Sequence, residues 1–147
     1  MYLEDYEIGK KYYIEENEVK EEEMIEFATK YDRRPFHLDS KAAKNTRFGK
    51  IFASGFFTLC FSWSKWANKN IDTEGIVAGI GIDNLLWIKP VFAGDKLKSI
   101  LTITAVVPSK NKNVGTIYAH YETTNQDNIK VFEMDVKYLA KKRPMKE

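Results

Sequence analysis

The sequence predicts an α+β fold in which an antiparallel β-sheet is wrapped around one long central α-helix. The first observation is an apolar segment at residues 55–68, which has the length of a helix and little polar surface. The second is a series of alternating apolar and polar runs after residue 75, which is typical of strands with one buried face. A sheet that hides one face needs an apolar partner, and the helix at 55–68 is the candidate.

The N-terminal part predicts a short strand followed by an amphipathic helix. In residues 2–16, a turn that contains Gly9 precedes a strand at Tyr12-Tyr13-Ile14. Residues 20–31 are expected to be helical, and acidic residues fill the first turn, where the helix dipole favours them. Four apolar residues recur there at i, i+3, i+4 and i+7 and predict one apolar face: Met24, Phe27, Ala28 and Tyr31.

Residues 32–53 lack a long periodicity and are rich in polar groups. Pro35 and Gly49 interrupt this segment. A short helix is expected near residues 40–45, with Asp39 or Ser40 as its N-cap. An irregular stretch of this length in a small chain is typical of a functional loop.

The segment at 55–68 predicts a buried helix. Ser54 stands where an N-cap belongs, and Asn68-Lys69-Asn70 ends the apolar run. Because Cys60 lies inside this helix, we expect its thiol to be inert packing. The apolar side chains that occupy most of the surface of this predicted helix are Phe56, Phe57, Leu59, Cys60, Phe61, Trp63, Trp66 and Ala67.

Four antiparallel strands are expected to complete the chain. They correspond to residues 76–88, 97–107, 115–124 and 132–138, where β-branched residues or apolar–polar alternation predominate. Turn-forming residues at Gly94-Asp95, 108–113 and 125–128 separate them.

Size and composition narrow the classes of protein. With 147 residues, the chain is expected to form a single domain over residues 1–147. The net charge of +2 argues against nucleic-acid binding, which usually requires a strongly basic surface. One cysteine excludes an intrachain disulfide and fits a reducing compartment. No signal peptide or run of roughly 18 apolar residues is present, so we expect a soluble, cytoplasmic protein without a membrane partner.

Asp32 and His37 are the candidate acid–base pair. A predicted helix end and Pro35 lie between them, so the chain bends and both side chains can face one cavity. A carboxylate and an imidazole that converge on one water molecule form a pair suited to neutral pH. From these residues alone, a cap or surface aspartate and a structural histidine remain the alternative. The other histidine, His120, is expected to be structural or at the surface.

Ser54 and Gly55 mark the start of the predicted buried helix. The first amides of a helix have no internal partner and carry partial positive charge, and glycine allows another group to come close. A thioester carbonyl placed there would have its developing negative charge stabilised. The alternative is that Ser54 and Gly55 only cap a core helix.

Three stretches of the chain, taken in order, form one pattern: Asp32-Arg33-Arg34-Pro35-Phe36-His37-Leu38-Asp39, then Ala42-Ala43 with Thr46-Arg47-Phe48-Gly49, then Ile51-Phe52-Ala53-Ser54-Gly55. This pattern closely resembles the hydratase motif of MaoC-like dehydratases and (R)-specific enoyl-CoA hydratases. The later stretch at residues 81–91, followed by Gly94-Asp95, is similar to the strand and turn that follow in that family. The resemblance covers nearly the whole chain and implies the hot-dog fold.

The resemblance also implies a function: hydration of 2-enoyl thioesters to 3-hydroxyacyl thioesters, or the reverse dehydration, with enoyl-CoA as the expected substrate. Asp32 and His37 match the catalytic residues, the Gly55 amide matches the donor to the thioester oxygen, and Ser54 falls where a small polar residue supports the aspartate. Neither a metal nor a redox cofactor is implied, and because members usually pair as dimers, we expect a homodimer or a higher homo-oligomer. We expect an acyl pocket and phosphate contacts from Arg34, Phe36, Phe52, Phe56 and Arg47.

Arg34 departs from the family pattern, in which many members have Asn. An arginine here can pair with Asp32 and weaken it as an acid, or turn outward toward a CoA phosphate. The departure keeps a non-catalytic acyl-CoA-binding protein open as an alternative. A hot-dog thioesterase, in which water attacks the carbonyl carbon, is another alternative.

Overall fold

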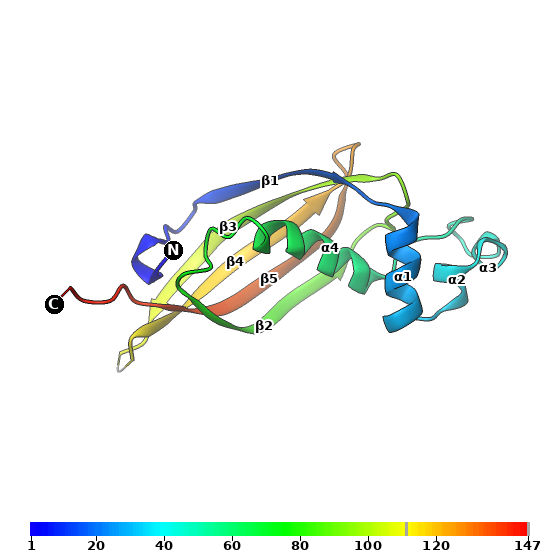
Figure 1. The fold of residues 1–147 in the computed structure, drawn as a ribbon. Coiled ribbons are helices and arrows are strands. Elements are labelled where there is room, and N and C mark those ends of the chain that lie inside the picture. The colour runs from blue at the N-terminus through cyan, green and yellow to red at the C-terminus, as the bar shows by residue number, and fades with distance from the viewer. Residues whose placement is uncertain (111, 147) are drawn as a thin grey trace.

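The computed structural model describes residues 1–110 and 112–146, and its centre is one five-stranded antiparallel sheet. The strands are ordered β1-β3-β4-β5-β2 (Figure 1). Their bounds are Lys11–Glu18 for β1, Ile76–Trp87 for β2, Lys96–Pro108 for β3, Val114–Thr124 for β4 and Lys130–Lys141 for β5. Because β2 and β1 occupy the two edges, the last strands of the chain form the middle of the sheet.

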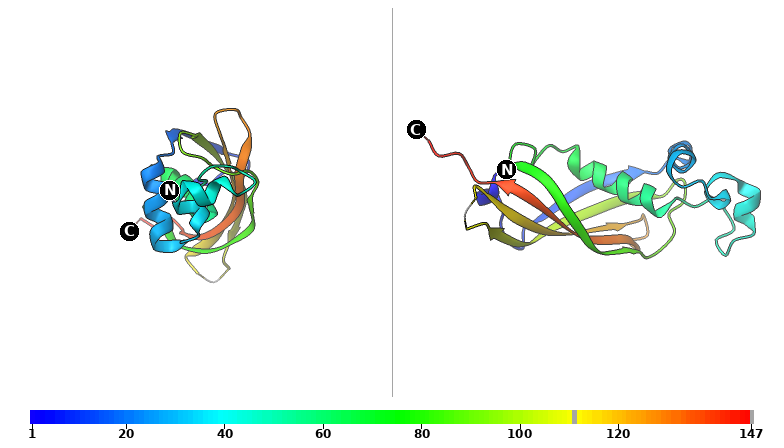
Figure 2. Two further views of the ribbon diagram at one scale, coloured as in Figure 1. Left: turned by 90° about the vertical axis from the view of Figure 1, so that its right-hand side faces the viewer. Right: turned by 90° about the horizontal axis from the view of Figure 1, so that it is seen from below.

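The longest helix, α4 (Gly55–Ala67), lies along the concave face of the sheet (Figure 1). The shorter helices gather beyond one end of α4, while both chain termini lie at the opposite end (Figure 2). These helices are α1 (Glu21–Tyr31), α2 (Pro35–Leu38) and α3 (Ser40–Lys44), and a 3₁₀ turn, η1 (Leu3–Asp5), precedes β1. The sheet therefore wraps a central helix, and the predicted hot-dog fold is confirmed.

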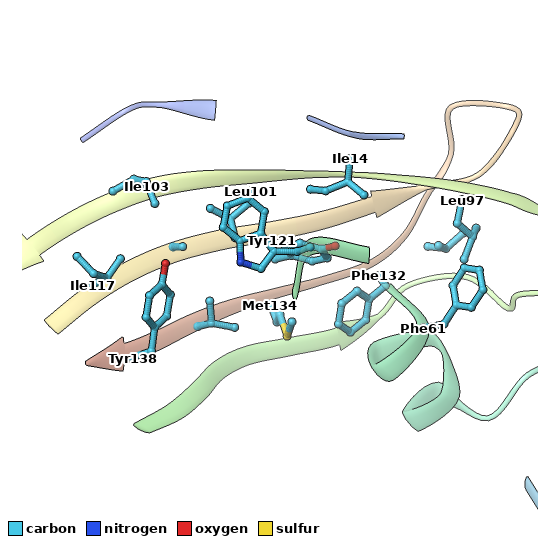
Figure 3. Packing of buried hydrophobic residues seen from close by; sticks show 14 of the residues in the cluster. Ile14, Phe61, Leu97, Leu101, Ile103, Ile117, Tyr121, Phe132, Met134 and Tyr138 are labelled. Atoms are coloured by element: carbon cyan, nitrogen blue, oxygen red, sulfur yellow. The ribbon is translucent and has the colours of Figure 1, made fainter. Parts of the chain in front are cut away.

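The core fills the space between α4 and the sheet. Alternate residues of the central strands point inward and are buried, as the sequence pattern predicted (Figure 3). From the helix, Phe57, Phe61 and Trp66 pack into the same cluster. Two hydroxyls in this core satisfy one another, because Ser99 Oγ and Thr123 Oγ1 lie 2.7 Å apart.

Most predicted helix and strand positions agree with the structure, including the N-caps. Asp39 caps α3 by accepting hydrogen bonds from the amides of Lys41 and Ala42. Ser54 caps α4 by accepting one from the amide of Phe56. The irregular segment contains one helix that the sequence did not predict, α2, which Pro35 begins at a position that suits proline. None of the helices among the described residues is long and apolar enough to cross a membrane.

Two predicted burial assignments are wrong. Tyr31 was expected on the buried face of α1 but is 72% exposed, because it lies at the end of the helix, beyond the neighbours that cover Met24 and Ala28. Cys60 was expected to be packed inside α4, but its side chain is exposed. The sheet covers only part of α4, and Cys60 follows Phe56 by one turn on the uncovered side.

Candidate active site

Asp32 and His37 come together at the end of the molecule where α1, α2 and α4 meet. Asp32 ends α1, with its amide bonded to the carbonyl of Ala28 at 2.9 Å. Pro35 then starts α2 and turns the chain so that His37 faces back. His37 Nε2 lies 3.6 Å from Asp32 Oδ2, which is beyond a direct hydrogen bond but close enough for both atoms to bind one water molecule.

A backbone carbonyl holds the ring of His37. Its Nδ1 lies 2.7 Å from the oxygen of Phe52, so Nδ1 carries the proton and donates it to this acceptor. The imidazole is buried, and the rings of Phe36 and Phe52 pack against its edges with centroids at 4.7 and 4.9 Å. In the neutral ring, Nε2 is therefore a proton acceptor that faces Asp32.

The carboxylate of Asp32 has two further partners. Ser54 Oγ donates a 2.7 Å hydrogen bond to Oδ2, and Arg34 Nε donates a 3.1 Å bond to Oδ1. Arg34 thus takes the first of its two predicted roles, pairing with Asp32, although its side chain is 68% exposed whereas that of Asp32 is 17% exposed. This pairing fixes the carboxylate without enclosing the guanidinium.

Three consecutive residues support both members of the pair. The carbonyl of Phe52 accepts from His37, the amide of Ala53 donates to the carbonyl of Val91 at 2.8 Å, and the hydroxyl of Ser54 donates to Asp32. Residues 52–54 therefore join the candidate acid–base residues to the segment that follows β2.

A cavity of about 510 Å³ opens beside this pair. Its wall includes His37, Gly55 and the expected substrate-binding residues Arg34, Phe36, Phe52 and Arg47. None of the described residues that line it is Asp or Glu, whereas three are cationic: Arg34, Arg47 and Lys89. Asp32 does not line the cavity itself, and its Oδ2 lies 3.6 Å from Nε2 of His37, a residue that does.

The predicted pocket residue Phe56 does not line this cavity. Its ring is 55% exposed and packs on Trp87 instead, with centroids 5.1 Å apart. Conversely, Thr58 and Lys89 line the cavity although the sequence interpretation missed both. The signal for Thr58 was its spacing, because residues 55 and 58 are i and i+3 and share one helix face. Lys89 had no comparable signal.

Gly55 is required by close packing at the start of α4. A Cβ added to Gly55 would collide with Cε2 of Trp87, so no larger residue fits without moving the indole. Among the described residues, no backbone or side-chain acceptor is bonded to the Gly55 amide, as expected for the first turn of a helix. Because Gly55 lines the cavity, this amide is the candidate donor to a ligand there.

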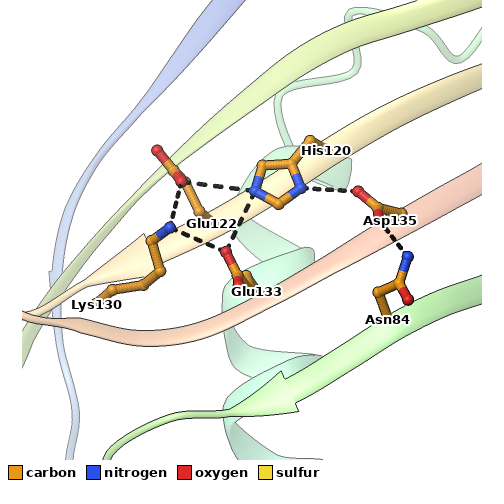
Figure 4. Close-up of polar contacts among 6 residues, drawn as sticks. All are labelled: Asn84, His120, Glu122, Lys130, Glu133 and Asp135. Atoms are coloured by element: carbon orange, nitrogen blue, oxygen red, sulfur yellow. Dashed lines mark hydrogen bonds and ion pairs between the residues drawn. The ribbon is translucent and has the colours of Figure 1, made fainter.

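His120 belongs to a separate polar cluster on the face of the sheet opposite α4 (Figure 4). Its Nδ1 lies 2.7 Å from Asp135, which also accepts a 2.9 Å bond from Asn84. Among the described residues, the side chains that could together ligate a metal ion are His120, Glu122 and Glu133, whose ligand atoms lie within 4.8 Å of one another. Lys130 binds both glutamates, at 3.1 and 2.9 Å, and already supplies positive charge there.

Comparisons with known proteins agree with this fold. Residues 5–126 match the family model for the MaoC like domain. The uncharacterized protein YdeM of Bacillus subtilis (strain 168) is 30% identical over 142 residues, which cover 97% of this chain and 100% of YdeM.

Two solved structures extend the comparison. The MaoC-like dehydratase from Rhodospirillum rubrum is 29% identical, with 99% of both chains covered and a TM-score of 0.90. The (R)-hydratase PhaJ1 from Pseudomonas aeruginosa is 24% identical, with 99% of this chain and 92% of that chain covered and a TM-score of 0.75, and it shares the fold. The family-model match covers most of the sequence, and on that basis this chain belongs to the MaoC-like domain family.

Proposed function

We propose that this protein adds water across the 2,3 double bond of 2-enoyl thioesters, or removes it from 3-hydroxyacyl thioesters. The observation that carries the proposal is the convergence of His37 Nε2 and Asp32 Oδ2 at 3.6 Å beside a cavity. A water molecule that donates to both acceptors directs an oxygen lone pair away from them, toward a substrate in the cavity.

The start of α4 supplies the second part of the mechanism. With the thioester oxygen at the Gly55 amide, attack of water on C3 moves electron density onto that oxygen, where the helix N-terminus stabilises it. The proton taken from water by the Asp32–His37 pair is then delivered to C2, which restores the thioester carbonyl. Dehydration follows the same steps in reverse.

The charge of the cavity supports a phosphate-bearing thioester such as acyl-CoA. Arg47 and Lys89 contribute positive charge, as does Arg34, whose Nε is paired with Asp32, and no carboxylate belongs to the described lining residues themselves. Arginine side chains suit phosphate because they offer several N–H donors in a plane. Aromatic rings of Phe36, Phe48 and Phe52 form the apolar remainder expected for the acyl group.

The direct test is hydration of crotonyl-CoA, which is measured by the loss of absorbance of the conjugated enoyl group. Asp32→Asn and His37→Ala should each lower kcat by on the order of 10²-fold or more, the scale of general acid–base catalysis. His120→Ala is the matched control, because it removes the other histidine of the chain at a site opposite α4. Unchanged hydration by the Asp32 or His37 variant would contradict the proposal, and release of free thiol would indicate a thioesterase instead.

We also propose that two copies of this chain pair through β2. This edge strand exposes several apolar side chains, and an open, apolar edge is a surface that proteins usually cover. The side chains are Val77, Ile80, Ile82 and Leu86, which are 45–52% exposed. Light scattering coupled to size exclusion should give twice the chain mass, and Ile80→Lys, at the edge, should shift the protein toward the monomer.

A further inference from the structure

Trp87, the last residue of β2, forms a wall of the candidate cavity beside the start of α4. Trp87 lines the cavity, and Phe56 supports it from the other side in an edge-to-face contact with centroids 5.1 Å apart and ring planes at 70°. The indole also lies directly over the helix start, where an added Cβ on Gly55 would touch it. An acyl group whose carbonyl is bound at the Gly55 amide therefore meets this indole close to its thioester end.

A second cavity of about 390 Å³ lies farther along the same seam between α4 and β2. From α4 it is lined by Leu59 and Trp63, and from β2 by Ile76, Gly79, Gly81 and Ile82. The two cavities share no lining residue. Phe56, Leu59 and Trp63 follow at i, i+3 and i+7 on one helix stripe, so Phe56 stands one turn before the second cavity. On β2, Trp87 follows Ile82 of the second cavity by five positions, so the Phe56–Trp87 pair stands on the β2 side between the two sets of lining residues.

This pair is not locked into the core. Phe56 is 55% exposed and Trp87 is 45% exposed, so neither ring is enclosed by the core cluster. The lining of the second cavity is mostly apolar, which suits hydrocarbon rather than a polar group.

We propose that Trp87, supported by Phe56, closes the acyl end of the catalytic cavity and restricts the substrate to short acyl groups. An acyl chain that passes this pair continues along the seam into the second cavity. The proposal rests on the proposed function, because it assumes that an acyl thioester is bound with its carbonyl at Gly55. It assigns a specificity-determining role to a residue that does not take part in proton transfer.

The test compares kcat/KM for 2-enoyl-CoA substrates with four and eight carbons. The wild-type protein should prefer the four-carbon substrate, and Trp87→Ala should raise the eight-to-four ratio at least tenfold. Trp63→Ala is the matched control, because it removes the same side chain from the second cavity and leaves the wall in place; its ratio should stay within twofold of wild type. Phe56→Leu, which keeps an apolar residue, should raise the ratio by a smaller factor. An unchanged ratio in Trp87→Ala, or an equal change in Trp63→Ala, overturns the proposal.

A binding measurement separates this proposal from the proposed function. Calorimetric titration with butyryl-CoA and octanoyl-CoA requires no turnover, and Trp87→Ala should strengthen octanoyl-CoA binding relative to butyryl-CoA at least tenfold. If the protein hydrates no enoyl thioester but Trp87→Ala changes this binding ratio, the hydratase function is wrong and the role of Trp87 in limiting acyl length is supported. If the protein hydrates enoyl thioesters but Trp87→Ala changes neither the kinetic ratio nor the binding ratio, the role of Trp87 is wrong and the hydratase function is supported.

Discussion

The hydroxyl of Ser54 donates a 2.7 Å hydrogen bond to Oδ2 of Asp32, although the two residues are 22 positions apart in the sequence. The same hydroxyl accepts from the amide of Phe56 at 3.3 Å and so caps α4. One side chain therefore begins the central helix and fixes the candidate acid–base carboxylate.

Ser54→Ala is expected to affect both roles. Loss of the cap should lower the free energy of unfolding by about 1 kcal/mol, measured by urea denaturation. Loss of the bond to Asp32 should lower kcat for crotonyl-CoA by roughly ten- to a hundredfold, because small displacements of a catalytic group are costly. Asp39→Ala, which removes the cap of α3, is the control for capping alone. A kcat loss no greater in Ser54→Ala than in Asp39→Ala would contradict the positioning role.

Arg34→Gln should have a small effect on turnover and a larger one on KM. The guanidinium is largely exposed, and exposed ion pairs stabilise their partners by only about 0–1 kcal/mol, so kcat should change less than about tenfold. The KM for crotonyl-CoA should rise in this variant, whereas the KM for a crotonyl thioester of pantetheine, which lacks phosphate, should stay unchanged. Equal increases of both KM values would show that Arg34 does not contact phosphate.

Gly55→Ala tests the packing at the helix start. The new methyl group would collide with the indole of Trp87, and overpacking of this kind typically costs about 1–3 kcal/mol. In a Trp87→Ala background, the same substitution should cost little, because the space is then free. Thermal unfolding of the two single variants and the double variant gives the coupling directly. Additive losses would mean that the collision is relieved elsewhere.

The cluster around His120 predicts a specific acid sensitivity. Partial burial raises the pKa of Asp135, but hydrogen bonds from Asn84 and His120 outweigh this effect and hold the pKa below its ordinary value of 3.8. A lowered pKa in the folded state contributes stability above the ordinary value, and this contribution is lost as the pH falls through the folded-state pKa. The native protein should therefore lose stability below about pH 4 through this group.

Asn84→Gly isolates that contribution. It removes the amide that bonds Asp135, while glycine accepts the positive φ of 52° at this position. The variant should be less stable than the wild type in urea unfolding near pH 6, and the difference should shrink near pH 3. Asn70→Gly, another left-handed asparagine, is the control for backbone effects. A difference that does not depend on pH would exclude the electrostatic explanation.

The sequence predicted the fold well because its signals were local. The alternation in residues 97–107 and the apolar segment after Ser54 each report which side chains face a core, and both are confirmed in β3 and α4. The failures at Tyr31 and Cys60 have a different origin. Each lies on a helix face that can be buried only by elements distant in sequence. Periodicity alone does not show how far those elements extend over the helix.

The sequence predicted which residues form the candidate site but not the contacts that orient them. The motif led to Asp32, His37, Ser54 and Gly55, which the structure brings together. His37, however, is oriented by a backbone group, the carbonyl of Phe52, and a backbone group leaves no trace in the amino-acid pattern. The outward position of Phe56 was equally hidden, because it depends on where the indole of Trp87 lies.

The linkage of residues 52–54 determines where this chain can tolerate changes in length. Each of the three residues makes a different long-range contact, so a single inserted residue would shift the carbonyl away from His37 or the hydroxyl away from Asp32. The preceding turn at residues 45–50 is mostly exposed and carries no such contact to the pair, so a change of length there leaves the Asp32–His37 geometry in place and alters only the part of the cavity wall that Arg47 and Phe48 form. Homologues should therefore vary in loop size before residue 51 and keep a fixed count from there to the helix.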